Sequence, residues 1–231
     1  MEGRINTDRV GQRAGRTGVM DRKDLLEIQK TIASKSITLD RFEKIKIIGG
    51  VDQAFLDDKI ISGIVLLDYN SLEVIDKVYT VLDVNFPYIS GLLAFREAPS
   101  IIKAYAELKT KPDLLMVDGC GINHPRFAGL ATHVGVELDV PSVGVAKKIL
   151  CGKYEHEPKT VNDLSLISYK DKKVGAIFKS KKNCNPLIIA PGHRVSLKSS
   201  IDIVRHCLRG YKLPEPTRLA HNYVGEVKKE L

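Results

Sequence analysis

The sequence Leu-Leu-Met-Val-Asp-Gly-Cys-Gly-Ile-Asn-His-Pro-Arg, residues 114–126, decides the fold. Its first four residues are apolar without interruption, which predicts a short strand buried on both faces. The strand ends on Asp118, and a carboxylate there is costly unless a partner compensates its charge. Open α/β sheets usually bind ligands in the crevice outside the carboxyl ends of strands. Asp118 is therefore a candidate site residue, with an Asp that only begins a turn as the alternative.

Length and composition indicate a single α/β domain with a polyanionic partner. The chain has 231 residues, enough for one substantial domain. The formal charge of +8 favours a polyanion such as nucleic acid, although many basic proteins bind none. The four cysteines lie far apart and form no CxxC pair, so neither a zinc site nor a disulfide framework is indicated. No run could cross a membrane and no secretory segment follows Met1, so we expect a cytoplasmic protein without a membrane partner.

Residues 1–22 differ in composition from the rest of the chain. They are rich in Arg and Gly and poor in large apolar residues, which predicts a flexible basic arm. Contact with phosphates is one role for such an arm, but a non-native extension or plain disorder explains the composition better. Residues 23–231 contain no internal repeat and no linker, so we expect one domain there, beginning with a helix through about Ser34.

Three strand-like segments follow at the spacing of hairpins, and we predict strands over 44–55, 60–68 and 73–82. Short connections of this kind imply an antiparallel meander. Asp52 lies in the first of these strands and interrupts a run that is otherwise apolar or Gly. It is the second carboxylate that the apolar pattern leaves unexplained.

The second half of the chain is predicted to alternate between helices and strands. Strands at 114–118 and 142–146 flank a helix at 129–138, and a crossover of this length favours parallel pairing. Residues 153–173 are polar without a clear period, so we expect an irregular excursion. The expected order ends with a hairpin over 174–178 and 187–190, a turn at 191–194, a helix from the cap Ser196 to about Arg209, and a last helix with Thr217 as N-cap.

A helix predicted over 91–109 carries a carboxylate on its buried face. Four apolar residues share one face at spacings of 3, 4 and 8: Leu93, Ile101, Ala104 and Leu108. Glu97 lies on the same stripe, four residues from both Leu93 and Ile101. A buried Glu costs several kcal/mol or shifts its pKa unless a cation lies opposite it. The alternative is a Glu at the helix edge whose side chain reaches solvent.

Asp52, Glu97 and Asp118 together indicate a metal site. A meander followed by a crossover can bring their three elements side by side. Carboxylate oxygens suit Mg²⁺ or Mn²⁺, which keep several waters and bind phosphate oxygens. Such a site activates water and stabilises charge on a phosphate. With a basic surface, the pattern therefore favours metal-dependent phosphodiester hydrolysis.

Five separated motifs resemble the endonuclease V family, the deoxyinosine-specific nucleases. They are found over roughly residues 40–225, in one order and at one set of spacings. The motifs are Gly50-Val51-Asp52; Pro87 to Glu97 (Pro-Tyr-Ile-Ser-Gly-Leu-Leu-Ala-Phe-Arg-Glu); Asp118 to Gly121 with His124-Pro125-Arg126; Gly144 to Lys148 (Gly-Val-Ala-Lys-Lys); and Leu213 to His221 (Leu-Pro-Glu-Pro-Thr-Arg-Leu-Ala-His). Agreement at all of them makes the resemblance highly specific.

The resemblance implies an RNase H-like α/β fold, with a mixed five-stranded sheet made of an antiparallel meander plus parallel strands and flanked by helices. It implies a Mg²⁺-dependent DNA-repair enzyme, with Mn²⁺ as the other ion, that acts on DNA containing deoxyinosine, whose base is hypoxanthine. The implied reaction is hydrolysis of the second phosphodiester bond 3′ to the lesion, which leaves 3′-hydroxyl and 5′-phosphate ends. We expect the protein to act as a monomer.

The resemblance also implies roles for individual residues. The metal ligands and catalytic groups match Asp52, Glu97, Asp118 and His221, although a histidine at the edge of an apolar stripe is more often structural. Lys147 matches a catalytic lysine that holds the scissile phosphate or the attacking water. The loop that wedges into the duplex matches Pro87, Tyr88 and Ile89. The pocket for the extruded hypoxanthine matches Gly91, Leu93, Gly119, Gly121, Ala146 and Leu150, and further polar positions match His124 and His133.

Two positions depart from the family pattern. The wedge motif often ends in a second Pro where this chain has Ser90, which puts the rigidity of the wedge in doubt. Cys120 stands where His is common, which removes a potential polar contact.

Two alternatives to a deoxyinosine endonuclease stay open. Inosine-containing RNA is a rival substrate, because discrimination depends on how the sugar 2′ position is contacted. The other alternative is a catalytically silent nucleic-acid-binding module on the same fold. A silent relative tends to lose at least one carboxylate, and all three are present here.

Overall fold

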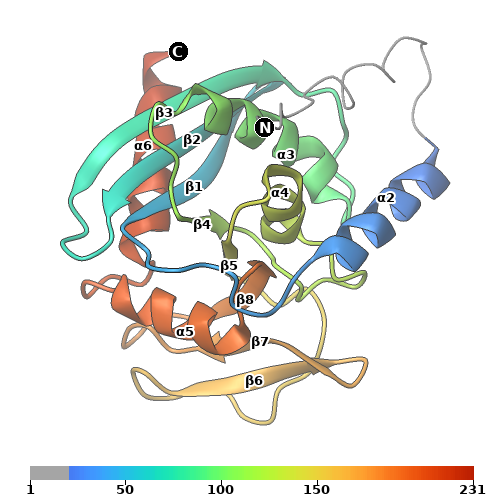
Figure 1. The fold of residues 1–231 in the computed structure, drawn as a ribbon, viewed down its shortest axis with the longest axis vertical. Helices are drawn as coiled ribbons and strands as arrows, with labels where there is room; N and C mark the ends of the chain where they lie inside the picture. Colours follow the sequence, from blue (N-terminus) through green and yellow to red (C-terminus); the bar gives the residue numbers. More distant parts are fainter. Residues whose placement is uncertain (1–20) are drawn as a thin grey trace.

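One mixed sheet runs through the centre of the computed structural model, which describes residues 21–231 (Figure 1). The helices are α2 (Arg22–Lys35), α3 (Leu93–Glu107), α4 (Leu130–Leu138), α5 (Leu197–His206) and α6 (Glu215–Glu230). The strands are β1 (Ile47–Leu56), β2 (Lys59–Asp68), β3 (Val74–Asp83), β4 (Leu114–Asp118), β5 (Ser142–Ala146), β6 (Leu164–Tyr169), β7 (Lys172–Phe178) and β8 (Leu187–His193). The arm predicted over 1–22 lies outside the described residues except for its last two, and Arg22 already belongs to α2.

The antiparallel meander predicted for the first three strands is confirmed. β1 pairs with β2 and β2 pairs with β3, both antiparallel, and each strand lies within three residues of its predicted bounds. The chain reverses after β1 at Asp57, whose φ of 51° is in the left-handed region that a short polar side chain tolerates. This register places Asp52 opposite Gly63 of β2, in the interior of the sheet.

β4 and β5 pair in parallel, as the crossover through α4 predicted. β1 also pairs in parallel with β4, and Val51 lies beside Val117 in that register. Side chains alternate along each strand, so the residues that follow, Asp52 and Asp118, project from the same face. The two predicted site residues are therefore neighbours where β4 ends.

The sheet has eight strands, in the order β3-β2-β1-β4-β5-β8-β7-β6, so the prediction of five strands is wrong. The predicted hairpin of β7 and β8 does form, but β8 also pairs antiparallel with β5 and extends the sheet. β5 is buried along its whole length. A sheet that ended there would leave buried backbone groups without partners, which the added strands prevent.

The prediction of an irregular excursion over 153–173 is also wrong, because β6 lies within it at the sheet edge. Ser165 and Ile167 are buried, whereas Leu166 between them is exposed. This alternation turns a polar residue inward and an apolar residue outward, which hides the strand from an apolar pattern. Pairing with β7 supplies the order that the local sequence does not show.

The turn predicted at 191–194 comes later than expected. β8 continues to His193, and its pairing with β5 absorbs the irregularity as a shift in register. Pro191 lacks an N–H donor, but its carbonyl accepts a hydrogen bond from the Ile122 amide at 2.8 Å. The chain bends at Arg194, whose φ is 56°.

Helices cover both faces of the sheet, which confirms the predicted layering (Figure 1). On one face, Ile101 of α3 and Val134 of α4 pack with Val117 of β4, and α2 lies against α4. On the other face, Val204 of α5 and Ala220 of α6 belong to the second core. None of the helices in residues 21–231 has the length and apolar character to span a membrane.

The two C-terminal helices begin differently. Ser196 caps α5 as predicted, since its hydroxyl accepts a hydrogen bond from the Ser199 amide at 3.1 Å. The N-cap of α6 is Pro214, so the prediction of Thr217 as N-cap is wrong. The helix can begin before Thr217 because Pro216 stands in its first turn, where a missing amide N–H costs no hydrogen bond within the helix. Thr217 is buried one turn into α6, and its hydroxyl donates to the Pro214 carbonyl at 3.2 Å.

Candidate active site

Asp52 and Asp118 form the centre of the candidate site, at the point where β4 ends beside β1. Asp52 is buried, and its carboxylate accepts a hydrogen bond from the Gln53 amide at 2.8 Å. Burial raises the pKa of Asp52 first, and the neighbouring charge of Asp118 raises it further. The charge of Asp118 therefore lies close enough to oppose the ionisation of Asp52.

His221 joins this pair from α6. Its Nδ1 lies 2.7 Å from Asp52 Oδ2, which makes it the hydrogen-bonding partner of that carboxylate. α6 can approach β1 this closely because Gly50 has no side chain, and a Cβ there would collide with the Pro216 backbone. The His221 side chain is more than half exposed, so its second ring nitrogen is left for another partner.

Lys147 supplies a positive charge on the other side of the pair. It follows β5, and its Nζ donates to Asp118 Oδ2 at 2.6 Å. Burial alone would lower the pKa of Lys147, but the charge and hydrogen bond of Asp118 raise it overall. Lys147 is therefore a cation with a partly exposed ammonium group beside the carboxylates.

Glu97 reaches the same region from α3, on the opposite face of the sheet from α6. The prediction that this side chain is buried is confirmed, since only 7% of the residue is exposed. Burial, and then the charges of Asp52 and Asp118, raise the pKa of Glu97 to about 7. The charges of Asp52 and Asp118 therefore oppose the ionisation of Glu97 in the folded chain.

The three carboxylates and the His221 imidazole suit a hard divalent cation by ligand type and charge. Carboxylate oxygens with one imidazole are ligands that Mg²⁺ or Mn²⁺ accept, and a cation would relieve the repulsion among the carboxylates. In the conformation described, however, His221 and Lys147 pair with two of them. Within residues 21–231, no three or more His, Cys, Asp or Glu side chains converge closely enough to hold a metal ion. The fit therefore rests on chemistry and not on a preformed cage.

The segment between β3 and α3, residues 84–92, contains the residues predicted to act as a wedge, and we call it the wedge loop. It projects from the surface before α3. Tyr88 is 73% exposed at its tip, and Pro87 and Ile89 beside it are also exposed. An aromatic ring that packed the loop onto the core would be covered. The exposure of Tyr88 therefore leaves it free to contact a partner.

The small residues predicted to line a base pocket are sites of close packing. A Cβ on Gly121 would collide with the Pro191 backbone, and one on Gly119 would press on the Leu130 side chain at 3.2 Å. The loop after Asp118 therefore lies directly on β8 and α4. Of the other predicted lining residues, Ala146 is buried, Leu93 is half-buried and Leu150 is exposed.

The two predicted supporting histidines lie in different places. His124 is buried in the loop after Asp118, and its Nε2 lies 3.1 Å from the Gly91 carbonyl oxygen. His133 is buried in α4, edge-on to the Phe95 ring at 5.5 Å between centroids. Burial lowers the pKa of both to about 4, so both rings are neutral at pH 7. His124 borders the wedge loop, whereas the contacts of His133 are those of a core residue.

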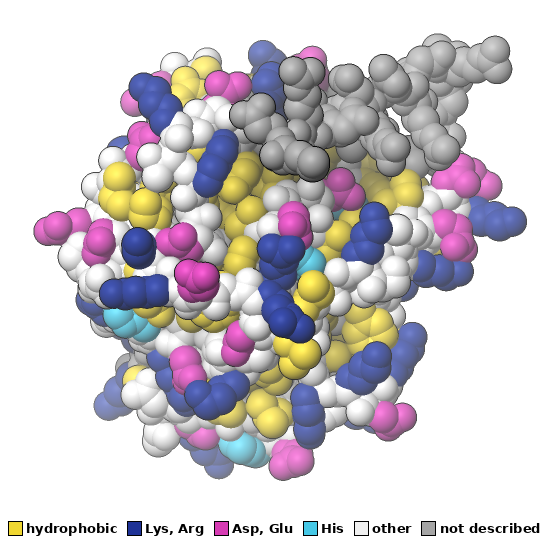
Figure 2. Space-filling model, viewed as in Figure 1, with side chains coloured by type: hydrophobic (Ala, Val, Ile, Leu, Met, Phe, Trp, Pro, Cys, Tyr) yellow, Lys and Arg dark blue, Asp and Glu magenta, His cyan; other side chains and the backbone are white. Residues whose placement is uncertain are grey.

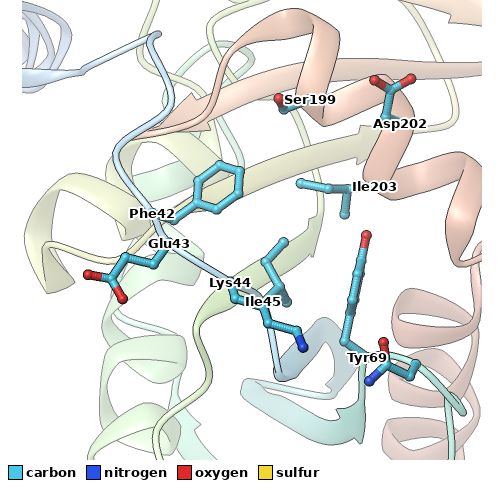
Figure 3. Close-up of a pocket in the computed structure, with 9 residues that line it drawn as sticks. Phe42, Glu43, Lys44, Ile45, Tyr69, Ser199, Asp202 and Ile203 are labelled. Atoms are coloured by element: carbon cyan, nitrogen blue, oxygen red, sulfur yellow. The ribbon is translucent and has the colours of Figure 1, made fainter.

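Two shallow surface hollows lie away from these carboxylates. A shallow pocket of about 360 Å³ lies between the segment before β1 and α5, and Figure 3 shows Phe42, Tyr69 and Ile203 facing it. A second hollow is lined by β3, α3 and Tyr223. Neither includes a predicted site residue. On the face seen in Figure 2, Lys and Arg side chains are interspersed with Asp and Glu, so positive charge is not gathered into one stripe there.

Sequence reasoning missed Gln29 of α2 and assigned no role to Arg126. Gln29 lies on the buried stripe of its helix between Leu25 and Ile32, and only 1% of it is exposed. A polar residue on an apolar stripe is the same signal that identified Glu97. Applied to α2, it would have identified Gln29.

Comparisons with known proteins show the family and the fold. The family model of endonuclease V matches residues 30–222. Endonuclease V of Dictyoglomus thermophilum is 46% identical over 201 residues, which cover 87% of this chain and 88% of the relative. The crystal structure of endonuclease V from Streptomyces avermitilis is similar with a TM-score of 0.86 at 30% identity, covering 94% of this chain and 96% of that one. Ciona intestinalis endonuclease V, solved with a DNA 24mer containing an inosine followed by a ribo-adenosine, shares the fold with a TM-score of 0.78 at 23% identity, covering 90% of this chain and 98% of that one.

Proposed function

The chain belongs to the endonuclease V family, and on that premise we propose that it is a metal-dependent DNA-repair endonuclease acting on deoxyinosine. The proposed reaction is hydrolysis of the second phosphodiester bond 3′ to the lesion, on an RNase H-like fold. The observation that carries the proposal is the pairing of Asp52 with His221 and of Asp118 with Lys147 on neighbouring strands, in the region that the buried Glu97 also reaches from α3.

Asp52, Glu97, Asp118 and His221 are the residues that would hold Mg²⁺ or Mn²⁺. Such an ion supplies an activated water and stabilises negative charge on a phosphate. Lys147 provides a positive charge beside Asp118, where it can bind the scissile phosphate or orient the water. The buried Asp52 carboxylate holds Nδ1 of His221, which leaves Nε2 as the ring nitrogen for a ligand or a proton.

Recognition of the lesion is assigned to the exposed Tyr88 and the loop after Asp118. An enzyme that reads a base must take it out of the stack, and an aromatic side chain can fill the gap that the base leaves. Gly91, Leu93, Gly119, Gly121, Ala146 and Leu150 would surround the extruded base with small or apolar groups. Because hypoxanthine lacks the exocyclic amine of guanine, a tight pocket can reject guanine by shape.

Two lysines near this loop support a polyanionic substrate. Lys170 Nζ lies 5.9 Å from the ring centroid of Phe127 and 5.2 Å from that of Tyr169, and Lys172 Nζ lies 5.3 Å from Phe127. Within residues 21–231, neither lysine forms an ion pair with a carboxylate. Phe127 follows the loop from Asp118, so a strand that leaves the carboxylates along this loop would meet uncompensated positive charge beside aromatic rings.

The test is cleavage of end-labelled oligonucleotides that carry one inosine at a known position. We expect Mg²⁺-dependent cutting of inosine DNA at the second bond 3′ to the inosine, none of the matched guanosine DNA, and none in EDTA. Cutting confined to inosine RNA would replace the substrate with RNA. Specific binding without cutting in Mg²⁺ or Mn²⁺ would support a silent binding module and contradict the proposed reaction.

A further inference from the structure

The carbonyl oxygen of Gly91 is a junction between three segments that are distant in sequence. It accepts hydrogen bonds from Gln29 Nε2 at 2.8 Å and from Arg126 Nη2 at 2.6 Å. His124 Nε2 lies 3.1 Å from the same oxygen. We call Gln29, Gly91, His124 and Arg126 the Gly91 junction. One backbone atom thus connects α2, the start of α3 and the loop after Asp118.

Gln29 uses both ends of its amide in this junction. Its nitrogen donates to Gly91, while its side-chain oxygen accepts a hydrogen bond from Arg126 Nε. Because Gln29 is almost fully buried, water cannot replace either partner. A buried amide with both groups satisfied fixes its neighbours in one arrangement. Removing it leaves Arg126 Nε without its acceptor, while the Gly91 carbonyl keeps Arg126 Nη2 and His124 as partners.

The position of Gly91 links the junction to the wedge residue Tyr88 and to the carboxylate of Glu97. Gly91 lies three residues after Tyr88 and six residues before Glu97. Its φ of 77° is in the left-handed region that favours glycine, and a Cβ would lie 2.9 Å from Arg126 Nη2. The direction of the Gly91 carbonyl therefore sets how the wedge loop enters α3, and the three donors hold that direction.

Arg126 and His124 belong to the loop that begins at Asp118. The His124 ring also accepts a hydrogen bond from the Arg126 amide at its Nδ1, 3.2 Å away, which fixes the loop internally. The junction therefore joins the wedge loop to the loop of a catalytic carboxylate. Gln29 is the member that comes from outside both loops, on α2.

We propose that Gln29 is a positioning residue that holds the wedge loop in register with the loop after Asp118, so that base extrusion and cleavage occur in one geometry. Its effect on DNA rests on the proposed function, whereas its effect on the order of the wedge loop does not. The alternative is that Gln29 only attaches α2 to the domain. Attachment alone predicts lower stability without a selective change at residues 84–93.

The first experiment is amide hydrogen exchange of the protein alone, comparing wild type with Gln29→Met. The methionine has similar length, no hydrogen-bond donor and only a weak sulfur acceptor. We expect exchange to speed up about tenfold in peptides covering 84–93, with little change in β2 (Lys59–Asp68). Leu72→Ala, a buried change in the β2–β3 turn, is the control for general destabilisation. Equal acceleration throughout the protein, or none at 84–93, would overturn the proposal.

The second experiment measures kcat and KM on inosine in duplex and in single-stranded DNA. For Gln29→Met we expect kcat/KM on duplex to fall about tenfold and to fall less on single strands, where less stacking has to be broken. Gln29→Glu keeps the acceptor for Arg126 and should recover part of the loss. Losses equal to those of Leu72→Ala, or equal on both substrates, would overturn the proposal. If wild type cuts no inosine substrate, the proposed function fails, and hydrogen exchange still decides whether Gln29 orders the loop.

Discussion

The carboxylate cluster (Asp52, Glu97 and Asp118) and the Gly91 junction are connected by two short segments of chain, but different forces dominate in them. In the cluster, burial raises the pKa values of Asp52 and Glu97 first; the charge of Asp118 then raises both, and the charge of Asp52 adds to the rise at Glu97. In the junction, each hydrogen bond to Gln29 or to the Gly91 carbonyl joins a donor to an acceptor, with Gln29 satisfied at both ends. The cluster is therefore suited to binding a cation, and the junction to holding a shape.

This contrast explains how carboxylates that repel one another can be held in an ordered structure. Charges that repel need a surrounding structure that keeps them in place until a ligand arrives. The junction supplies part of that structure from α2, outside the sheet. Changes in the cluster should therefore alter chemistry more than shape, and changes in the junction should do the reverse.

The largest expected effect comes from removing a charge from the cluster. Asp52→Asn or Asp118→Asn should reduce cleavage of inosine DNA by about 10³-fold or more, because several kcal/mol of charge stabilisation is lost. Binding of the substrate should remain largely intact, because the wedge loop is untouched. Asp202→Asn on the surface of α5 is the matched control. Substantial Mg²⁺-dependent cutting by either purified cluster variant would contradict the metal assignment.

The next effect concerns stability and pH without metal. The pKa of Glu97 rises from 4.5 to about 7 on folding, so the folded chain holds this proton more tightly than the unfolded chain. The corresponding stability is present below pH 4.5 and is lost as the pH rises through about 7, up to about 3 kcal/mol in all. Glu97→Gln should therefore gain in melting temperature over wild type between pH 5 and pH 8 in EDTA.

Glu107→Gln, on the exposed end of the same helix, is the control for this comparison. Mg²⁺ should stabilise wild type and not Glu97→Gln if the carboxylate binds the ion. A Glu97→Gln variant that is much less stable than wild type in EDTA at pH 8 would show instead that Glu97 has a structural partner.

A smaller effect should separate the wedge from the junction that holds it. Tyr88→Ala should weaken the interaction with duplex inosine DNA by about 1–3 kcal/mol, or roughly 5- to 150-fold, because the stacking of its ring is removed. The loss should be smaller on single strands, and the melting temperature should hardly change because the ring is exposed. Tyr79→Ala on β3 controls for the loss of an exposed ring. Equal losses on both substrates, together with a large fall in melting temperature, would identify Tyr88 as a packing residue.

The smallest expected effect tests the path of the nucleic acid beyond both regions. Binding should weaken with salt because neutralising phosphates releases counterions. Replacing Lys170 and Lys172 by Gln should reduce the slope of log affinity against log salt by about 0.7–0.9 for each phosphate that is no longer neutralised. The double change of Lys228 and Lys229 to Gln removes the same charge from the end of α6. Identical slopes for the two double variants would show that Lys170 and Lys172 bind no phosphate.

The sequence alone determined the parts of the site that break a local pattern. Asp118 after a buried strand, Asp52 within an apolar run and Glu97 on a buried stripe each stood out from their neighbours, and the motif resemblance then indicated one family. The meander and the parallel crossover followed from connection lengths. These features are local, because apolar periodicity records which side of an element is buried.

The tertiary structure decided what depends on partners far away in the chain. β6 has a buried Ser165 and an exposed Leu166, so only its pairing with β7 reveals it as a strand. β8 extends past Pro191 because β5 needs a partner along its length. The role of Gln29 depends on atoms 62 and 97 residues away in Gly91 and Arg126. A local pattern can show that a polar group is buried, but the group that satisfies it is chosen only when the distant segments pack together.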